Sequence, residues 1–172
     1  ALYCGAAVDF VDIDLKTNNM SAIELERKLI RAKNSQSLPK VVIPVHMGCF
    51  SCDMKAIHAL SIKYNFRIIE DASHAVGASY LGNTVGNCRY SDIVVFSFHP
   101  VKIITTAEGG MALTKDAKLN DRLNLFRSHG ITRDPNQMNQ EPDGDWYYQQ
   151  LELGYNYRMT ELQGALGCSQ MR

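Results

Sequence analysis

Residues 67–71 read RIIED, and residues 93–98 read IVVFSF. Short apolar runs rich in β-branched residues and bounded by polar residues are typical of buried strands. These runs alternate along the chain with stretches of helical periodicity, such as residues 22–33, which follow a capping box that begins at Ser21. This alternation predicts an α/β fold in which helices flank a mostly parallel sheet.

The remaining elements are expected from the same kinds of signal. Strands are expected at residues 8–13, 41–45 and 110–114, and helices are expected after the N-cap residues Asp53 and Asp116 and after the capping box of Thr160 and Gln163. Gly130 is expected at the C′ position of the helix that begins after Asp116. Residues 131–150 are polar and irregular, which predicts a surface excursion.

Composition and charge exclude several classes of protein. Hydrophobic residues make up 45% of the 172 residues, which is enough for the core of one globular domain. Eighteen basic and eighteen acidic side chains give a net charge of zero, which argues against a nucleic-acid-binding surface. No apolar stretch is long enough for a membrane span, and no export signal is visible. Five cysteines, an odd number, then favour reduced thiols and a cytoplasmic location.

The segment from residue 70 to residue 110 holds the side chains best suited to chemistry. Lys102 follows a buried strand and has Val101 and Ile103 as neighbours. An apolar environment lowers the pKa of a lysine and makes its amine a nucleophile or base, as in lysines that form Schiff bases. The alternative is a lysine whose stem lies on apolar surface while its ammonium group reaches water.

Three other polar side chains stand close to Lys102 in the predicted topology. Asp71 ends a strand, where its carboxylate can hold a cationic ring nitrogen or simply cap the following turn. Ser97 can donate its hydroxyl to a phosphate oxygen or bond to the backbone. His74 follows Asp71 by three residues and can face the same ligand, or it is one more partly buried histidine.

Together these residues resemble the DegT/DnrJ type of nucleotide-sugar aminotransferases, which have fold type I and use pyridoxal 5′-phosphate. The resemblance covers essentially the whole chain and rests on four blocks: EDASHA at 70–75, SFHPVK at 97–102, EGG at 108–110 and GYNYR at 154–158. It implies that residues 1–172 are a partial large, cofactor-binding α/β domain. The N-terminal phosphate-binding turn and the small C-terminal domain of complete members are expected to be absent from this sequence.

The resemblance implies a role for each of the four clustered residues. Lys102 matches the catalytic lysine that carries the cofactor and moves a proton at the substrate carbon. Asp71 matches the carboxylate that keeps the pyridine nitrogen protonated. His74 matches a position that packs on the cofactor or bonds its phenolic oxygen, and Ser97 matches a ligand of the cofactor phosphate.

Three further residues and the reaction follow from the same resemblance. Asn156 matches an asparagine that reaches the cofactor phosphate of the other subunit, which implies a homodimer with a shared active site. His99 and Arg158 are left as candidates for substrate contacts. The implied reaction is a ping-pong transfer of an amino group from an amino acid, expected to be L-glutamate, to a 4-keto-6-deoxy nucleotide sugar.

The branch within the family is suggested by two loops. Residues 127–135 and 146–150 are similar to the branch that acts in pseudaminic acid synthesis, which would supply a sugar for a surface or flagellar glycan. A perosamine-type member is the alternative. The family also contains dehydratases with histidine in place of the lysine, and Lys102 favours transamination.

Two interpretations of another kind remain. His46, Cys49 and Cys52 have a spacing that suits three zinc ligands, and the cysteine pair alone suits redox chemistry. Small thiols that pack after a strand explain the same residues without a metal, and no metal is expected. A regulatory or scaffold protein on the same fold is the second alternative, and the presence of both Lys102 and Asp71 argues against it.

Overall fold

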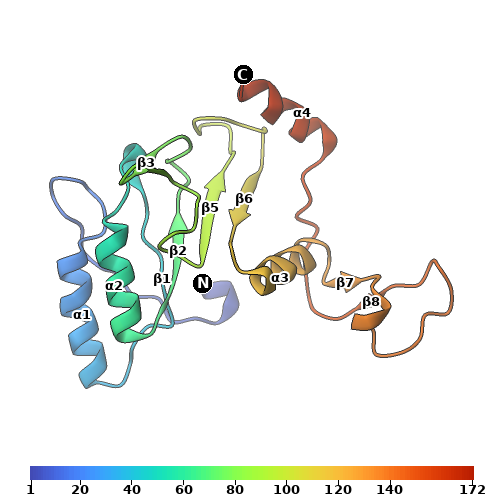
Figure 1. Cartoon of the computed structure of the whole chain (residues 1–172), viewed down its shortest axis with the longest axis horizontal. Coiled ribbons are helices and arrows are strands. Elements are labelled where there is room, and N and C mark those ends of the chain that lie inside the picture. The colour runs from blue at the N-terminus through green and yellow to red at the C-terminus, as the bar shows by residue number, and fades with distance from the viewer.

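A four-stranded sheet in the order β1-β2-β5-β6 forms the centre of the computed structural model, which describes residues 1–172 (Figure 1). The strands are β1 (Val41–Val42), β2 (Arg67–Asp71), β5 (Ile93–Ser97) and β6 (Gly110–Leu113). β1, β2 and β5 are parallel, whereas β6 pairs with β5 in antiparallel register. The predicted mostly parallel α/β architecture is therefore confirmed.

Helices and two small hairpins surround this sheet. The α-helices are α1 (Ala22–Asn34), α2 (Met54–Tyr64), α3 (Ala117–Arg127) and α4 (Glu161–Gln170), and short 3₁₀ helices cover Leu2–Cys4, Met47–Cys49 and Pro135–Gln137. The hairpins pair β3 (Ser79–Tyr80) with β4 (Asn83–Thr84) and β7 (Ile131–Thr132) with β8 (Gln149–Gln150). None of the helices has the length and apolar character needed to cross a bilayer.

All four predicted α-helices are confirmed, and each starts at the expected cap. The backbone N–H groups of the first turn of a helix have no partner within the helix. They donate instead to the side chains of Ser21 in α1, Asp53 in α2 and Asp116 in α3. Thr160 and Gln163 complete a reciprocal capping box at α4. These local bonds explain why the helix starts are readable from sequence.

The core lies between the sheet and the layer formed by α1 and α2, which stand side by side in Figure 1. Leu25 and Leu29 of α1, Ile57 of α2 and Ile68 of β2 are all buried there. On the other face of the sheet, apolar side chains such as Val41, Ile43 and Val45 remain exposed. The sheet of this chain is thus covered on one face only.

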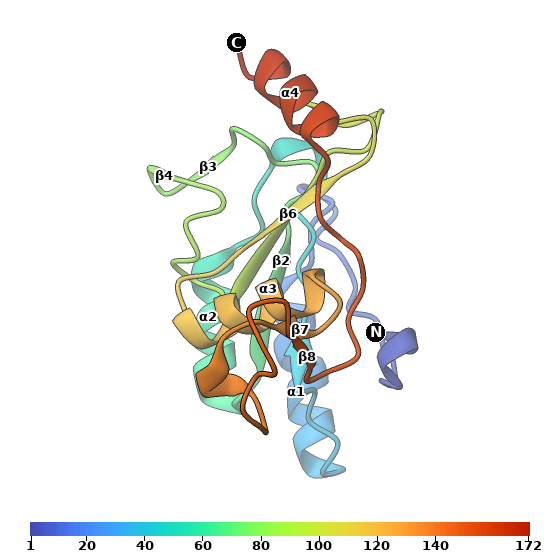
Figure 2. The same ribbon diagram turned by 90° about the vertical axis from the view of Figure 1, so that its right-hand side faces the viewer.

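The C-terminal third contributes little to this core. Neither α3 nor α4 contains a buried residue. Both views place α4 at the end of the sheet where β5 and β6 are joined, and β7 and β8 beside α3 toward the other end (Figures 1 and 2). The backbone N–H of Thr105 in the joining loop donates to the side chain of Gln170 at 3.4 Å.

Two predicted strands are longer than the β-structure that is observed. Residues 8–13 alternate as a strand does, but they form only an isolated bridge between Ile13 and Met20, because no neighbouring strand is present to complete a ladder. The predicted strand at 41–45 is regular only at Val41–Val42 and resumes as one bridge from Val45 to Asp71. Pro44 lies between these points and has no N–H to donate.

The end of α3 also differs from the prediction. The helix stops at Arg127, with Ser128 as C-cap and His129 in the left-handed region at φ 63°. Gly130 therefore occupies C″, and its N–H donates to the carbonyl of Leu125 at 2.9 Å. This is the outer bond of a Schellman motif, while the N–H of His129 donates to the carbonyl of Tyr155 at 2.8 Å in place of the inner bond. Both His129 and Gly130 are left-handed, so the left-handed turn begins one residue before the predicted glycine.

Replacing Ile57 with alanine is expected to lower the free energy of unfolding by about 3 kcal/mol, because a fully buried side chain leaves a cavity behind it. Ile62 in the same helix is the matched control, since its side chain is 73% exposed and Ile57 is 0% exposed. Urea unfolding followed by far-ultraviolet circular dichroism measures both. Equal losses for the two substitutions would contradict the described core.

Candidate functional site

The site begins where neighbouring parallel strands end. Asp71 is the last residue of β2 and pairs with Val95 of β5, and Ser97 ends β5 two residues further on. Successive residues of a strand point to opposite faces. Glu70 and Val94 are buried and pair with each other, and Glu70 is in phase with Ile68, which packs in the core formed with α1 and α2. Asp71, Val95 and Ser97 therefore face the opposite, open side of the sheet.

Both polar side chains keep bonding capacity at this edge. Asp71 Oδ1 accepts from the N–H of Ser73 at 3.0 Å, which leaves Oδ2 without a partner in the protein. Ser97 Oγ accepts from the N–H of His99 at 3.4 Å, so its own hydroxyl hydrogen is free to donate. The edge therefore offers one carboxylate acceptor and one hydroxyl donor.

Lys102 lies in the loop that joins β5 to β6. The N–H of Lys102 donates to the carbonyl of His99 at 3.0 Å, and the loop closes where the N–H of Phe98 donates to the carbonyl of Gly109 at 2.8 Å. A Cβ at Gly109 would lie 2.2 Å from Thr106 Oγ1. The middle residue of the EGG block therefore has no room for a side chain while Thr106 keeps this position.

The structure places Lys102 beside His74. Lys102 Nζ lies 2.8 Å from His74 Nε2, a distance at which the amine donates and the imidazole accepts. The apolar pocket expected around Lys102 is not present in this chain, because Val101 is 81% exposed and Ile103 51% exposed. The feature that distinguishes this lysine is its imidazole neighbour.

His99 has a partner that the sequence did not reveal. Its Nδ1 lies 3.1 Å from Glu108 Oε1, across the base of the loop that carries Lys102. Both side chains are exposed. The pair links the two ends of the loop, and His99 lies close enough to Lys102 in the chain to contact the same ligand.

Asn156 and Arg158 are not part of this cluster. Asn156 forms an isolated bridge with Ser128, the C-cap of α3, and the N–H of Tyr157 donates to the carbonyl of Arg127 at 2.9 Å. Arg158 continues the same exposed segment toward α4. The chain thus brings together Asp71, Ser97 and the His74–Lys102 pair, and holds Asn156 and Arg158 on a separate segment beside α3.

The zinc and redox interpretations find no support in the geometry. His46 uses both ring nitrogens in hydrogen bonds, to Glu70 at 2.7 Å and from the N–H of Cys52 at 3.2 Å. The thiol of Cys52 donates to the carbonyl of Val45 at 3.1 Å, while Cys49 is exposed. No group of three His, Cys, Asp or Glu side chains in the structure is arranged to hold a metal ion.

Burial raises the pKa of the Cys52 thiol to about 11. At pH 8 only about one molecule in a thousand then carries the reactive thiolate at this position. We expect iodoacetamide at pH 8 to label the exposed Cys49 in the folded protein and to label Cys52 only after unfolding. Peptide mass spectrometry checks this, and rapid labelling of Cys52 in the folded state would contradict its burial.

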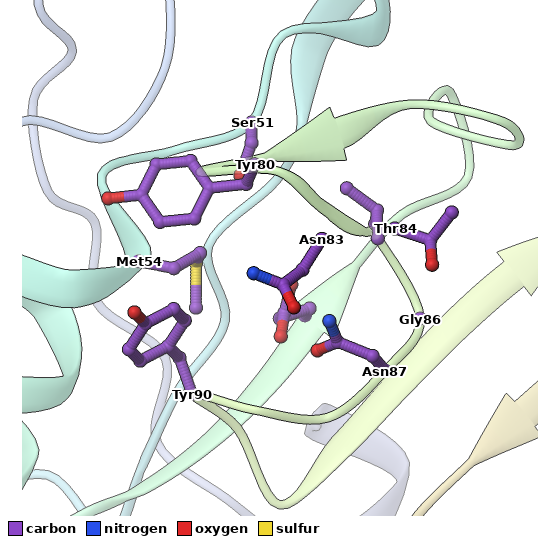
Figure 3. Close-up of a pocket in the computed structure, with 10 residues that line it drawn as sticks. Ser51, Met54, Tyr80, Asn83, Thr84, Gly86, Asn87 and Tyr90 are labelled. Atoms are coloured by element: carbon purple, nitrogen blue, oxygen red, sulfur yellow. The ribbon is translucent and has the colours of Figure 1, made fainter.

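A small pocket lies on the other side of the sheet, between the β3–β4 hairpin and the start of α2 (Figure 3). The rings of Tyr80 and Tyr90 and the thioether of Met54 border it, and Asn83 and Asn87 reach toward it. Glu70 is the only one of its lining residues that belongs to the EDASHA block. The pocket contains neither Asp71 nor Lys102.

The sequence matches the DegT/DnrJ/EryC1/StrS aminotransferase family over residues 1–172. It is 40% identical to a UDP-4-amino-4,6-dideoxy-N-acetyl-beta-L-altrosamine transaminase of Campylobacter jejuni over 172 residues, which are 100% of this chain and 42% of the relative. It is also 40% identical to a GDP-perosamine synthase of Caulobacter vibrioides over 169 residues, 98% of this chain and 40% of the relative.

A solved structure gives the same relationship in three dimensions. Helicobacter pylori PseC, an aminotransferase involved in the biosynthesis of pseudoaminic acid, superposes with a TM-score of 0.84 at 30% identity. The match covers 99% of this chain and 41% of that structure. The chain therefore spans about 40% of the length of the relatives it matches.

Proposed function

Since the chain belongs to the DegT/DnrJ/EryC1/StrS aminotransferase family, we propose that it forms part of the large domain of an enzyme that moves an amino group from L-glutamate to a 4-keto-6-deoxy nucleotide sugar. The observation that carries this proposal is the cluster at one edge of the sheet. Lys102 lies 2.8 Å from His74 there, and the two adjacent strands β2 and β5 end at Asp71 and Ser97. The amine, the carboxylate and the hydroxyl are groups that this chemistry uses, and the imidazole lies beside the amine.

The groups present fit pyridoxal 5′-phosphate. The free Oδ2 of Asp71 would accept from a protonated ring nitrogen, and the hydroxyl of Ser97 would donate to a phosphate oxygen. Lys102 would hold the cofactor through its amine, with the ring of His74 beside it. Bound there, the cofactor supplies an electron sink for the carbon that loses a proton.

The side chains of this chain would then perform three tasks. Asp71 keeps a positive charge on the ring nitrogen, because a carboxylate within bonding distance favours the protonated form. Lys102 moves the proton at the reacting carbon, and His74, as acceptor at Nε2, helps to keep its amine in place. His99 is proposed to contact the substrate, with Glu108 orienting it. Arg158 is also proposed to contact substrate, and because it lies on the same separate segment as Asn156 it would do so in the site of a second subunit.

Asn156 is proposed to serve the cofactor phosphate of a second subunit. Its place beside α3, away from Lys102 in the same chain, supports this role. The enzyme would then be a homodimer with shared active sites, and we propose that it works in the cytoplasm, where nucleotide sugars are made.

Pyridoxal phosphate trapping tests the proposal. The complete reading frame that contains these residues is expressed, incubated with the cofactor, reduced with borohydride and digested, and the modified peptide is identified by mass. We expect a pyridoxyl group on Lys102 that is lost in Lys102→Ala. No adduct, or adducts scattered over surface lysines such as Lys118, would refute the mechanism and favour a scaffold role.

The substrate is proposed to be the 4-keto precursor of a pseudaminic-acid-type sugar, carried by UDP. The similarity to the altrosamine transaminase over the whole chain supports this choice. The equal identity to a GDP-perosamine synthase makes the GDP-linked 4-keto sugar the second candidate. Incubating the enzyme and glutamate with each ketosugar in turn, and comparing the rates at which the aminated product forms, decides between them.

A further inference from the structure

The largest buried polar cluster lies behind the edge that carries Asp71. His46 is completely buried and Glu70 nearly so, and His46 Nε2 lies 2.7 Å from Glu70 Oε2. The other oxygen of Glu70 accepts from the hydroxyl of Ser91. None of these three side chains has a task in the chemistry proposed above, and burying polar groups is costly unless they are bonded.

The bonds fix the protonation of His46. Nδ1 accepts from the N–H of Cys52 at 3.2 Å, so it carries no hydrogen, and the proton must reside on Nε2. Nε2–H then donates to the Glu70 carboxylate. His46 is thus a neutral, fully bonded donor whose position depends on Glu70.

The backbone of the same residues holds Asp71. The N–H of His46 donates to the carbonyl of Asp71, and the N–H of Asp71 donates to the carbonyl of Pro44, both at 2.9 Å. The side chains of Glu70 and Asp71 point to opposite faces of β2. Any shift of Glu70 on the buried face therefore moves the carboxylate of Asp71 on the open face.

The loop that begins at His46 also holds His74. The N–H of Cys49 donates to the carbonyl of His74 at 3.1 Å. The buried side chain of Asn19 fixes this loop from the other side, since it accepts from the N–H of Met47 at 2.8 Å and donates to the carbonyl of Phe50 at 2.9 Å. One loop, anchored by His46, thus supports both Asp71 and the imidazole that contacts Lys102.

From these contacts we propose that His46 and Glu70 are positioning residues that set the Asp71 carboxylate against the ring nitrogen of the cofactor. The inference rests on the proposed function. It predicts that breaking the His46–Glu70 bond weakens the interaction with that nitrogen selectively, and leaves contacts with the rest of the cofactor unchanged.

Two substitutions of His46 separate this role from packing. In His46→Asn the amide can replace Nδ1 and accept from Cys52, but nothing reaches Glu70. In His46→Gln the amide nitrogen can replace Nε2 and donate to Glu70. The probes are pyridoxal phosphate and its analogue with carbon in place of the ring nitrogen, bound to the protein from the complete reading frame and measured by equilibrium dialysis.

We expect His46→Asn to weaken pyridoxal phosphate binding by about tenfold. Losses of this size are typical of metal sites when a residue that orients a metal-binding side chain is removed. His46→Gln should bind pyridoxal phosphate within about twofold of the unsubstituted protein. Binding of the carbon analogue should be the same in all three proteins. Should His46→Asn fail to fold, Ser91→Ala removes the other partner of Glu70 by a smaller change, and the same selective loss is expected.

Equal weakening of both probes would overturn the inference in favour of a general structural role, and so would unchanged binding of both. If the unsubstituted protein binds the analogue as tightly as pyridoxal phosphate, Asp71 does not hold the ring nitrogen and the inference fails while cofactor binding stands. If it binds neither probe, the proposed function itself is refuted.

Discussion

Amino transfer is expected to slow by about a thousandfold or more when Lys102 is replaced by alanine, since general acid–base catalysis alone contributes about 10²–10⁴-fold and this lysine is proposed to hold the cofactor as well. Lys102 is the only lysine whose amine lies against His74 at the edge formed by Asp71 and Ser97. Product formation from glutamate and the ketosugar, followed by chromatography, measures the rate.

Two controls make this result specific. Lys118, exposed on α3, is replaced by alanine and should leave the rate unchanged. Lys102→Arg keeps a positive charge beside His74, but a guanidinium group is not a nucleophile or a base, so the loss should match that of alanine. Substantial activity in Lys102→Arg would show that charge alone matters and would contradict the proposed role.

The elements that sequence predicted well are those whose signals are local. The caps at Ser21, Asp53 and Asp116 bond to backbone groups within a few residues, so the pattern of residues contains the whole interaction. The strand at Arg67–Asp71 was readable because Ile68 is buried and Ile69 half-buried in a strand that lies between two others. Residues 8–13 failed because a strand also needs a neighbour, which sequence alternation does not report.

The cluster around Lys102 was predicted only in part. The parallel strands ending at Asp71 and Ser97 follow from the topology, but the bond from His74 to Lys102 depends on how two loops fold toward each other. The His99–Glu108 pair depends on loop closure in the same way. Spacing along the chain does not determine either distance.

The burial of Glu70, and its need for a partner such as His46, could have been predicted from the sequence. In the strand at 67–71, Glu70 stands in phase with the buried Ile68, which predicts a buried carboxylate in need of a donor. A histidine after the neighbouring strand is a natural candidate for that donor. The competing zinc interpretation rests on the spacing of His46, Cys49 and Cys52, which carries no information about the bond from His46 to Glu70.

The segment that carries Asn156 depends on two glycines that meet at the end of α3. A Cβ at Gly154 would lie 2.3 Å from the nitrogen of Gly130, 2.7 Å from the carbonyl carbon of His129 and 2.8 Å from the carbonyl oxygen of Phe126. All three are backbone atoms, so none can move aside by rotating a side chain. The next residue, Tyr155, bonds to Phe126 and His129 through its backbone at 2.9 and 2.8 Å.

Gly154→Ala is therefore expected to detach the segment from α3 at a cost of about 4 kcal/mol, above the usual range for overpacking because the contacts are rigid. Gly164→Ala in α4 is the matched control: nothing lies within 4 Å of the added methyl group, and alanine favours a helix by about 0.5–1 kcal/mol. Limited proteolysis should cut near residue 154 far faster in the first variant only.

If Asn156 serves the cofactor phosphate of a second subunit, Gly154→Ala should also weaken pyridoxal phosphate binding while Gly164→Ala leaves it unchanged. Normal binding together with rapid cleavage would separate the segment from the active site and refute that role of Asn156.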